Sequence, residues 1–194
     1  SLPLGLLVCW GKMSKIPVIR WIVTAYISIM RGTPLMLQLM VVYFGPYFIF
    51  GIRISMGYSL IAVFIAFTIN YAAYFAEIYR GGIESMPVGQ YEAAKILGYS
   101  KAQTFFRIIL PQVFKRILPS ITNEVITLVK DTSLARAIAL QEVIWAAESF
   151  MKGNQGISGL WWPLMFTAVY YLAFSAIVTM VLGRLEKKLD YFRV

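Results

Sequence analysis

The chain has 194 residues, of which 59% are hydrophobic and only 14% are charged, and its formal net charge is +9. Soluble domains carry about 25% charged residues, so this composition predicts an integral membrane protein with no separate soluble domain. Histidine is absent and Cys9 is the only cysteine, which excludes an internal disulfide, a Cys/His metal site and histidine-based catalysis. A site built from carboxylates alone has no support in the sequence, so we expect no bound metal.

The predicted elements begin with an apolar stretch that is too short to cross a bilayer. A transmembrane helix needs about 20 mostly apolar residues, so the chain has room for four or five spans. Residues 1–10 read SLPLGLLVCW and carry no charged side chain. We expect them to be the end of a first span whose beginning is missing, because a signal peptide carries a positively charged segment before its apolar core.

A second hydrophobic run extends to about Phe50 and is interrupted by the sequence RGTP at 31–34. Glycine and proline both weaken a helix, and the sequence leaves two alternatives open. Arg31 either ends a helix at the membrane interface or marks a kink inside a span. Three further spans are predicted, at 57–80, 111–130 and 160–183.

The cations lie mostly on one side of these spans. Two cations, Arg53 and Lys152, fall on the opposite side, and the depth of Arg31, Lys130 and Arg136 is left open. The other 13 of the 18 share one side and are Lys12, Lys15, Arg20, Arg80, Lys95, Lys101, Arg107, Lys115, Arg116, Arg184, Lys187, Lys188 and Arg193. By the positive-inside rule this side is cytoplasmic. The positive net charge therefore reflects topology, and we expect no nucleic-acid partner.

The segment 92–111 reads EAAKILGYSKAQTFFRIILP and predicts a cytoplasmic helix–turn–helix. Its first residues favour a helix, and Gly98 is typical of the position just after a helix end. Ser100 followed by Gln103 has the capping-box pattern, which predicts a second helix that ends near Pro111. The alternative is an ordinary amphipathic loop that lies on anionic lipid.

The same segment resembles the EAA loop of permease subunits of bacterial ABC importers. Three other stretches resemble the polar amino acid subfamily: RGTPLMLQL at 31–39, AEIYRGGIES at 76–85 and KDTSLA at 130–135. The residues that match the loop at its defining positions are Glu92, Ala93, Ala94, Gly98, Ile108, Leu110 and Pro111.

This resemblance implies an all-α type I fold of about five transmembrane helices, with the N-terminus outside and the whole chain, 1–194, as one permease domain. Residues 84–111 would form the coupling helices, which sit in a cleft of an ATP-binding cassette subunit. The implied partners also include a second permease copy or a homologue, an extracytoplasmic substrate-binding protein and the bilayer of the bacterial cytoplasmic membrane. ATP and Mg would bind to the partner subunit. Because this chain has no GxxxxGK[ST] phosphate loop, we expect it to hold no cofactor and not to be an enzyme.

Polar residues inside two spans form stripes on helix faces. A charge at mid-bilayer costs about 2.5–3.5 kcal/mol, so charged residues inside a span indicate a functional or a structural role. One stripe, at intervals of three and four, consists of Ser120, Asn123, Glu124, Thr127, Lys130 and Asp131. The other consists of Asn70, Tyr71, Tyr74 and Glu77. Two facing stripes could enclose a polar solute. The alternative is that they pair with one another, or Glu77 with Arg80, and only hold helices together.

The sequence KDTSL at 130–134 is a poor helix interior, because Asp, Thr and Ser side chains compete for backbone hydrogen bonds. The residues that follow favour a helix, so we predict that a helix restarts near Leu134. If this break lies within the membrane, its free N–H groups suit a carboxylate, and Glu124 and Asp131 could take an ammonium group. A less specific alternative is that Asp131, Thr132 and Ser133 only cap an extracellular helix.

These patterns predict a translocation path for an α-amino acid. The predicted substrate site comprises Asn70, Tyr71, Tyr74, Glu77, Glu124, Lys130, Asp131, Thr132, Ser133 and Leu134. Its acidic residues favour a cationic amino acid (arginine, lysine or histidine), and the tyrosines could stack on it or simply pack. The alternatives are an importer of another solute such as glutamine and, less well supported, an ion channel. A membrane-embedded enzyme ranks last, because no nucleophile–base pair is evident.

Overall fold

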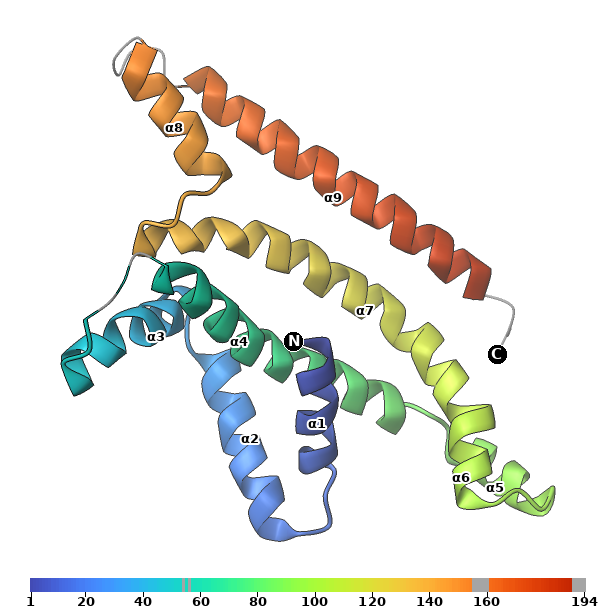
Figure 1. Cartoon of the computed structure of the whole chain (residues 1–194). Helices are drawn as coiled ribbons and strands as arrows, with labels where there is room; N and C mark the ends of the chain where they lie inside the picture. Colours follow the sequence, from blue (N-terminus) through green and yellow to red (C-terminus); the bar gives the residue numbers. More distant parts are fainter. Residues whose placement is uncertain (54, 56, 155–160, 190–194) are drawn as a thin grey trace.

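The computed structural model describes residues 1–53, 55, 57–154 and 161–189, and the regular elements among them are all helical (Figure 1). Two irregular helices flank α7: a π-helical turn, η1 (Thr104–Ile109), and a 3-10 helix, η2 (Thr132–Ile138). The α-helices are α1 (Leu2–Lys12), α2 (Pro17–Gly32), α3 (Leu35–Phe50), α4 (Tyr58–Glu84), α5 (Val88–Ile96), α6 (Lys101–Gln103), α7 (Leu110–Asp131), α8 (Val143–Asn154) and α9 (Trp161–Leu189). The expected all-α fold is confirmed. Leu160, where the last predicted span begins, and Arg193 lie outside the described residues.

Helix α4 is the centre of the structure, and α1, α2, α3 and α7 pack against it. Its buried face is rich in small residues, which let helix backbones approach closely. Gly5 of α1 lies so near α4 that a Cβ atom at Gly5 would be 2.8 Å from the Cβ atom of Phe75. The alanines of this face are at most 2% exposed and are Ala62, Ala66, Ala72, Ala73 and Ala76.

Two described helices, α4 and α9, are long and apolar enough to cross a membrane, and the bent pair of α2 and α3 makes a third candidate. Within the most apolar 18 residues of the candidate span Trp162–Leu185 of α9, only 6% are buried in the chain itself, so lipid or another subunit must cover this helix. Helix α7 covers the predicted span at 111–130 and packs between α4 and α9 (Figure 1). Helix α7 is not among these apolar candidates because it carries several charged residues.

The RGTP sequence is a sharp corner between two helices. Helix α2 ends at Gly32 and α3 begins at Leu35, and the two axes meet at 106°. Thr33 and Pro34 are extended, as expected because proline disfavours a helical conformation in the residue before it. Arg31 therefore lies in the last turn of α2, directly before the corner.

The segment that follows α4 folds largely as predicted. Gly98 adopts a left-handed conformation, with φ at +77°, just after α5. Ser100 and Gln103 form the expected capping box. The prediction that the second helix ends near Pro111 was wrong, because α6, η1 and α7 follow one another without a break. Pro111 is tolerated near the start of α7, where the wider π-helical turn before it removes the need for a regular i−4 hydrogen bond.

Adjacent glycines of α4 provide a matched test of the contact between α4 and α7. A Cβ atom at Gly82 would lie 2.2 Å from Cγ2 of Ile117, a stiff β-branched side chain, whereas a Cβ atom at Gly81 would meet nothing within 4 Å. We expect Gly82→Ala to lower the free energy of unfolding by about 1–3 kcal/mol. Gly81→Ala should leave it unchanged or raise it slightly. Thermal unfolding of both variants in the same detergent measures the difference, and equal stabilities would contradict the close contact between Gly82 and Ile117.

Candidate functional site

Asn70, the first residue of the predicted α4 stripe, is used by the fold. Its side chain is 3% exposed, and its amide nitrogen donates to the carbonyl of Met30 at 3.0 Å and to Oε1 of Gln38 at 2.9 Å. The amide nitrogen of Gln38 in turn donates to the carbonyl of Met30 and to both oxygens of Thr33. These bonds hold the corner between α2 and α3, so we interpret Asn70 as a structural residue.

Tyr71 connects the two predicted stripes. Its hydroxyl donates to Oδ2 of Asp131 at 2.6 Å, and its ring is 2% exposed between those of Phe67 and Phe75. The predicted proximity of the α4 and α7 stripes is therefore observed. A ring packed in this way has no free face for a substrate, and its hydroxyl holds the carboxylate of Asp131 in place.

Tyr74 and Glu77 lie on the side of α4 that faces the end of α2. The guanidinium carbon of Arg31 is 5.3 Å from the centroid of the Tyr74 ring, which is the geometry of a cation–π contact. Glu77 accepts from Lys12 at 2.7 Å and from Arg80 at 2.7 Å, and Nη1 of Arg31 is 3.9 Å away. The alternative of a Glu77–Arg80 pair is thus observed, and the same carboxylate also connects α4 to α1 and α2.

The polar cluster comprises Lys12, Arg31, Tyr74, Glu77 and Arg80, and Glu124 of α7 lies within electrostatic range of Arg31. It is half-buried, and the charged groups that act on it are Arg31 and Asp131. Among the described residues, no side chain forms an ion pair with its carboxylate. Glu124 is therefore the carboxylate of the predicted stripes that the fold leaves available.

The predicted helix restart at Leu134 was wrong. Helix α7 passes directly into the 3-10 helix η2 at Thr132, so no separate helix starts after a break at 131–134. The hydroxyl groups of Thr132 and Ser133 donate to the carbonyls of Val129 and Lys130 and so stay within the preceding turn. Because the turn is continuous, its N–H groups are not free for a substrate carboxylate.

A new helix begins only at α8, and its start is already capped. The carboxylate of Glu142 accepts from the backbone N–H groups of Ile144 and Trp145, each at 2.8 Å. Arg136 of η2 pairs with Glu148 of α8 and ties the two segments together. The start of α8, which the sequence did not predict as a site, is therefore occupied by an acidic side chain of the chain itself.

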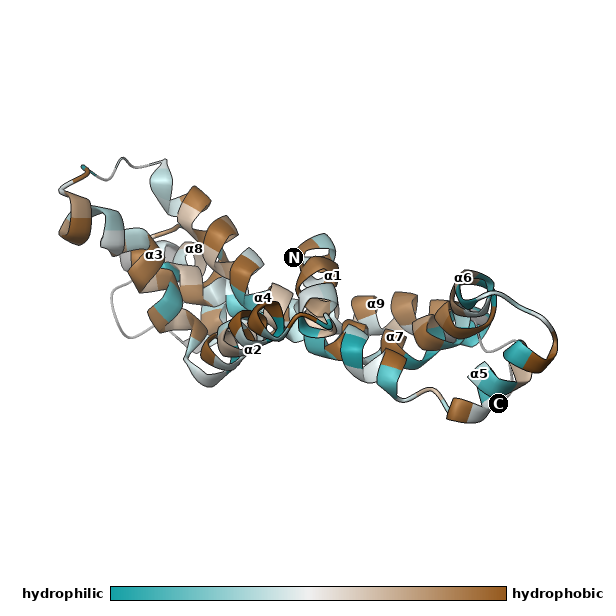
Figure 2. Ribbon diagram, turned by 90° about the horizontal axis from the view of Figure 1, so that it is seen from below, coloured by the Kyte–Doolittle hydropathy of each residue, from teal (hydrophilic) through white to brown (hydrophobic). Residues whose placement is uncertain are grey.

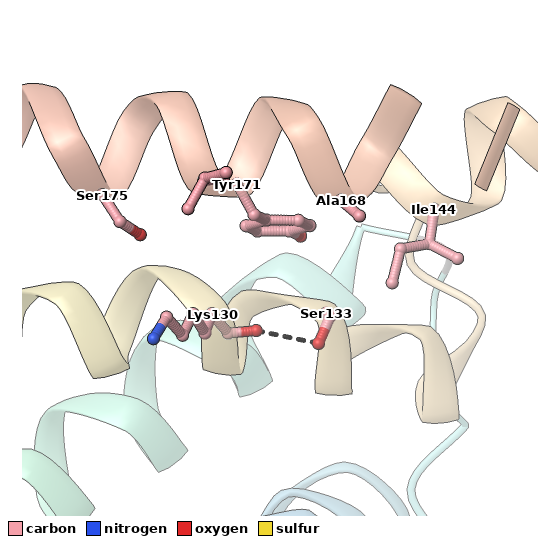
Figure 3. Close-up of a pocket in the computed structure, with 7 residues that line it drawn as sticks. Lys130, Ser133, Ile144, Ala168, Tyr171 and Ser175 are labelled. Carbon is pink, nitrogen blue, oxygen red and sulfur yellow. Dashed lines mark hydrogen bonds between the residues drawn. The ribbon is translucent and has the colours of Figure 1, made fainter. Parts of the chain in front are cut away.

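A cavity of about 420 Å³ lies between the end of α7, the start of α8 and α9 (Figure 3). Of the residues predicted to bind substrate, Lys130 and Ser133 line it, whereas Leu134 does not. Tyr171 and Ser175 of α9 point into it and were not predicted (Figure 3). They share one face of α9 with Ala168 and Leu172, at helical spacing. The polar residues Tyr171 and Ser175, one turn apart in an uncharged span, were the signal that could have identified them.

No group of three or more Cys, Asp or Glu side chains in the described part of the chain is arranged to hold a metal ion. The chemistry that the polar cluster and the cavity can perform is recognition: carboxylates, an ammonium group, hydroxyl groups and an aromatic face lie along α4, α7 and α9.

The comparisons with known proteins assign the family. The family model described as "Binding-protein-dependent transport system inner membrane component" matches residues 1–191. The chain belongs to this family. It is 35% identical to the L-cystine transport system permease protein TcyB of Bacillus subtilis, over 97% of this chain and 78% of that protein. It is 37% identical to the arginine transport system permease protein ArtQ of the same organism, over 97% and 84%.

A solved structure supports the same assignment. The permease superposes with a TM-score of 0.85 and 32% identity on a crystal structure described as an amino acid ABC transporter with histidines, over 96% of this chain and 84% of that one. The resemblance to type I amino acid importers is therefore confirmed. The family also implies an ATP-binding subunit as a partner.

The EAA segment of the permease forms an exposed tip beyond the ends of α4 and α7, where Figure 2 shows hydrophilic and hydrophobic residues interspersed. Ala94 is 1% exposed and packs α5 inward, whereas Glu92 and Ala93 face outward. Ile108 and Leu110 are half-buried in the helix that leads to α7, and Pro111 is exposed. The strongly exposed apolar side chains at this tip are Val88, Ile96, Leu97 and Phe106.

Replacing Asn70 tests whether it serves the fold or the substrate. Asn70→Ala removes two hydrogen bonds at the corner between α2 and α3, so we expect the free energy of unfolding to fall by about 1–3 kcal/mol. Asn123→Ala changes an exposed asparagine of α7 in the same way and should cost little. Thermal unfolding measures both, and substrate affinity of the folded fraction should be unchanged. If the Asn70→Ala variant were stable but had lost its affinity for the substrate, Asn70 would be a substrate-binding residue instead.

Proposed function

We propose that this permease forms the translocation path for a polar, cationic amino acid in an ATP-driven importer that works by alternating access. Its membership of the family supports amino acid import. The cationic assignment rests on one observation: the polar cluster already accommodates a guanidinium group, that of Arg31, against Tyr74 and near Glu77. Free arginine carries the same guanidinium group, and lysine and protonated histidine carry other cationic groups.

The relatives favour this substrate class without deciding it. One relative is named for arginine, and the similar solved structure is described with histidines, but another relative of nearly the same identity is named for L-cystine. A neutral polar amino acid such as glutamine is therefore the second candidate. The carboxylate of Glu124 favours the cationic one, because it has no ion-pair partner among the described residues and a cationic side chain can pair with it, whereas a neutral side chain cannot.

The proposed assembly places the exposed tip of α5 and η1 in the cleft of the ATP-binding subunit, which binds ATP and Mg. A second permease copy or a homologue covers the apolar face of α9, and an extracytoplasmic substrate-binding protein delivers the amino acid. The assembly lies in the bacterial cytoplasmic membrane. Its direct test is reconstitution of the permease with its ATP-binding subunit in vesicles that contain the delivery protein. ATP-dependent uptake of labelled arginine, lysine or histidine should exceed that of glutamine, and uptake of none would refute the proposal.

Gly98 tests the proposed coupling segment. Its left-handed backbone strains a β-branched residue even though the surrounding space is open, so Gly98→Val should distort the tip while the spans stay folded. We expect substrate-stimulated ATP hydrolysis by the complex to fall about tenfold. Gly98→Asn is the matched control, because asparagine tolerates this conformation, and it should retain most of the activity. Normal substrate-stimulated ATP hydrolysis in the valine variant would show that the segment does not couple the permease to the ATP-binding subunit.

Glu124 tests the proposed substrate site. Glu124→Gln keeps the shape of the side chain and removes its charge, so we expect binding of a cationic amino acid to weaken at least tenfold, about 1.4 kcal/mol. Asp131→Asn also removes a charge, but its amide oxygen can still accept from Tyr71, so the contact between α4 and α7 is retained. We expect Asp131→Asn to weaken binding to the same extent. Titration of the purified complex with arginine measures the affinity of each variant. Loss of assembly with unaltered affinity would show that these carboxylates only hold helices together.

A further inference from the structure

Arg31 of the polar cluster is more exposed than expected for a residue with a purely structural role. Its guanidinium lies over the ring of Tyr74, yet its side chain is 45% exposed. It stands in the last turn of α2, directly before the extended residues Thr33 and Pro34, so its position depends on the corner between α2 and α3. An exposed guanidinium on an aromatic face is the arrangement that a bound cationic amino acid would also adopt.

Arg31 is also the most weakly held of the three cations around Glu77. Lys12 and Arg80 each approach the carboxylate to 2.7 Å, whereas Nη1 of Arg31 is 3.9 Å away. Coulomb attraction falls with distance, and exposed pairs are weakened further by solvent. Loss of Arg31 from this position therefore leaves Glu77 paired with Lys12 and Arg80.

We propose that Arg31 is a tethered competitor for the cation subsite of the permease. Its guanidinium occupies the face of Tyr74 on which the side chain of a cationic amino acid stacks, and entry of that substrate displaces it. Exchange of one cation for another keeps the charge of the cluster constant. This inference rests on the proposed function, and it identifies Arg31 as a residue that sets specificity and lowers affinity for cationic substrates.

The consequence is a substrate-selective gain when the competitor is removed. Arg31→Gln should tighten arginine binding about fivefold, because the substrate no longer has to displace a guanidinium from Tyr74. Glutamine carries no charge that competes for the aromatic face, so its binding should be unchanged. Arg31→Lys keeps a cation at the site and should stay close to the wild type.

The experiment is titration calorimetry on the purified complex of permease and ATP-binding subunit, with arginine and glutamine as ligands. Arg20→Gln removes an exposed arginine from the same helix and is the matched control, which should bind arginine like the wild type. Tyr74→Leu removes the shared aromatic face. In that background Arg31→Gln should give no further gain, which distinguishes competition at Tyr74 from a general change of charge.

Each outcome decides the inference. Weaker arginine binding in Arg31→Gln, an equal change for glutamine, or a fivefold gain that persists without Tyr74 would overturn it. Failure of Arg31→Gln to assemble, whether or not Arg31→Lys rescues it, would show that Arg31 is a structural cation and would overturn it as well. If the wild-type complex binds no cationic amino acid, the proposed function itself is contradicted. If the wild type binds arginine and Arg31→Gln has no effect on that binding, only the inference that Arg31 competes with the substrate is refuted.

Discussion

The carboxylate of Glu77 is the contact on which the arrangement of the first helices depends. Residues 1–76 contain no Asp or Glu, so the cations of α1 and α2 have no acidic partner within their own helices. Glu77 lies in α4, is 15% exposed, and meets Lys12 of α1 and Arg31 of α2 as well as Arg80 of its own helix. Because a cation without a counter-ion is costly away from water, α1 and α2 are stable where they can reach this residue.

The close approach of the helices makes that contact possible. The alanine-rich face of α4 and Gly5 of α1 bring the two backbones together, so that the ammonium group of Lys12 reaches the carboxylate of Glu77. On the same helix, Asn70 secures the corner between α2 and α3 and so positions Arg31. Packing of small residues and pairing of polar ones therefore act together, and neither would define the polar cluster alone.

The polar residues of α4 and α7 divide into two groups with different uses. Asn70, Tyr71 and Glu77 have partners in the chain and make the frame rigid. Glu124 has no ion-pair partner among the described residues, and the face of Tyr74 is covered by the partly exposed Arg31. The helical path from Lys101 through η1 to Asp131 is continuous. The η1 part of the exposed tip and Glu124 of α7 therefore lie on one continuous helical element.

The local pattern of the sequence was sufficient to predict several features. The apolar runs predicted the membrane class and the long helices α4, α7 and α9, because span length and hydropathy are properties of consecutive residues. The left-handed Gly98 and the capping box at Ser100 were predictable for the same reason, since each involves residues at most three positions apart. The EAA pattern and its companion stretches identified the family, which the comparisons confirmed.

The tertiary structure determined which polar residues have hydrogen-bond or ion-pair partners within the chain. Helical spacing placed Asn70, Tyr71 and Glu77 on one stripe, but their partners, Gln38, Asp131 and Lys12, lie 32, 60 and 65 positions away, and no local pattern reveals such pairs. The start of a helix at Leu134 was mispredicted because a continuous turn satisfied the hydroxyl groups of Thr132 and Ser133. Tyr171 and Ser175 joined the cavity only because α9 folds back on α7. Sequence determined the elements and the family, whereas packing between distant helices determined which side chains are left for a substrate.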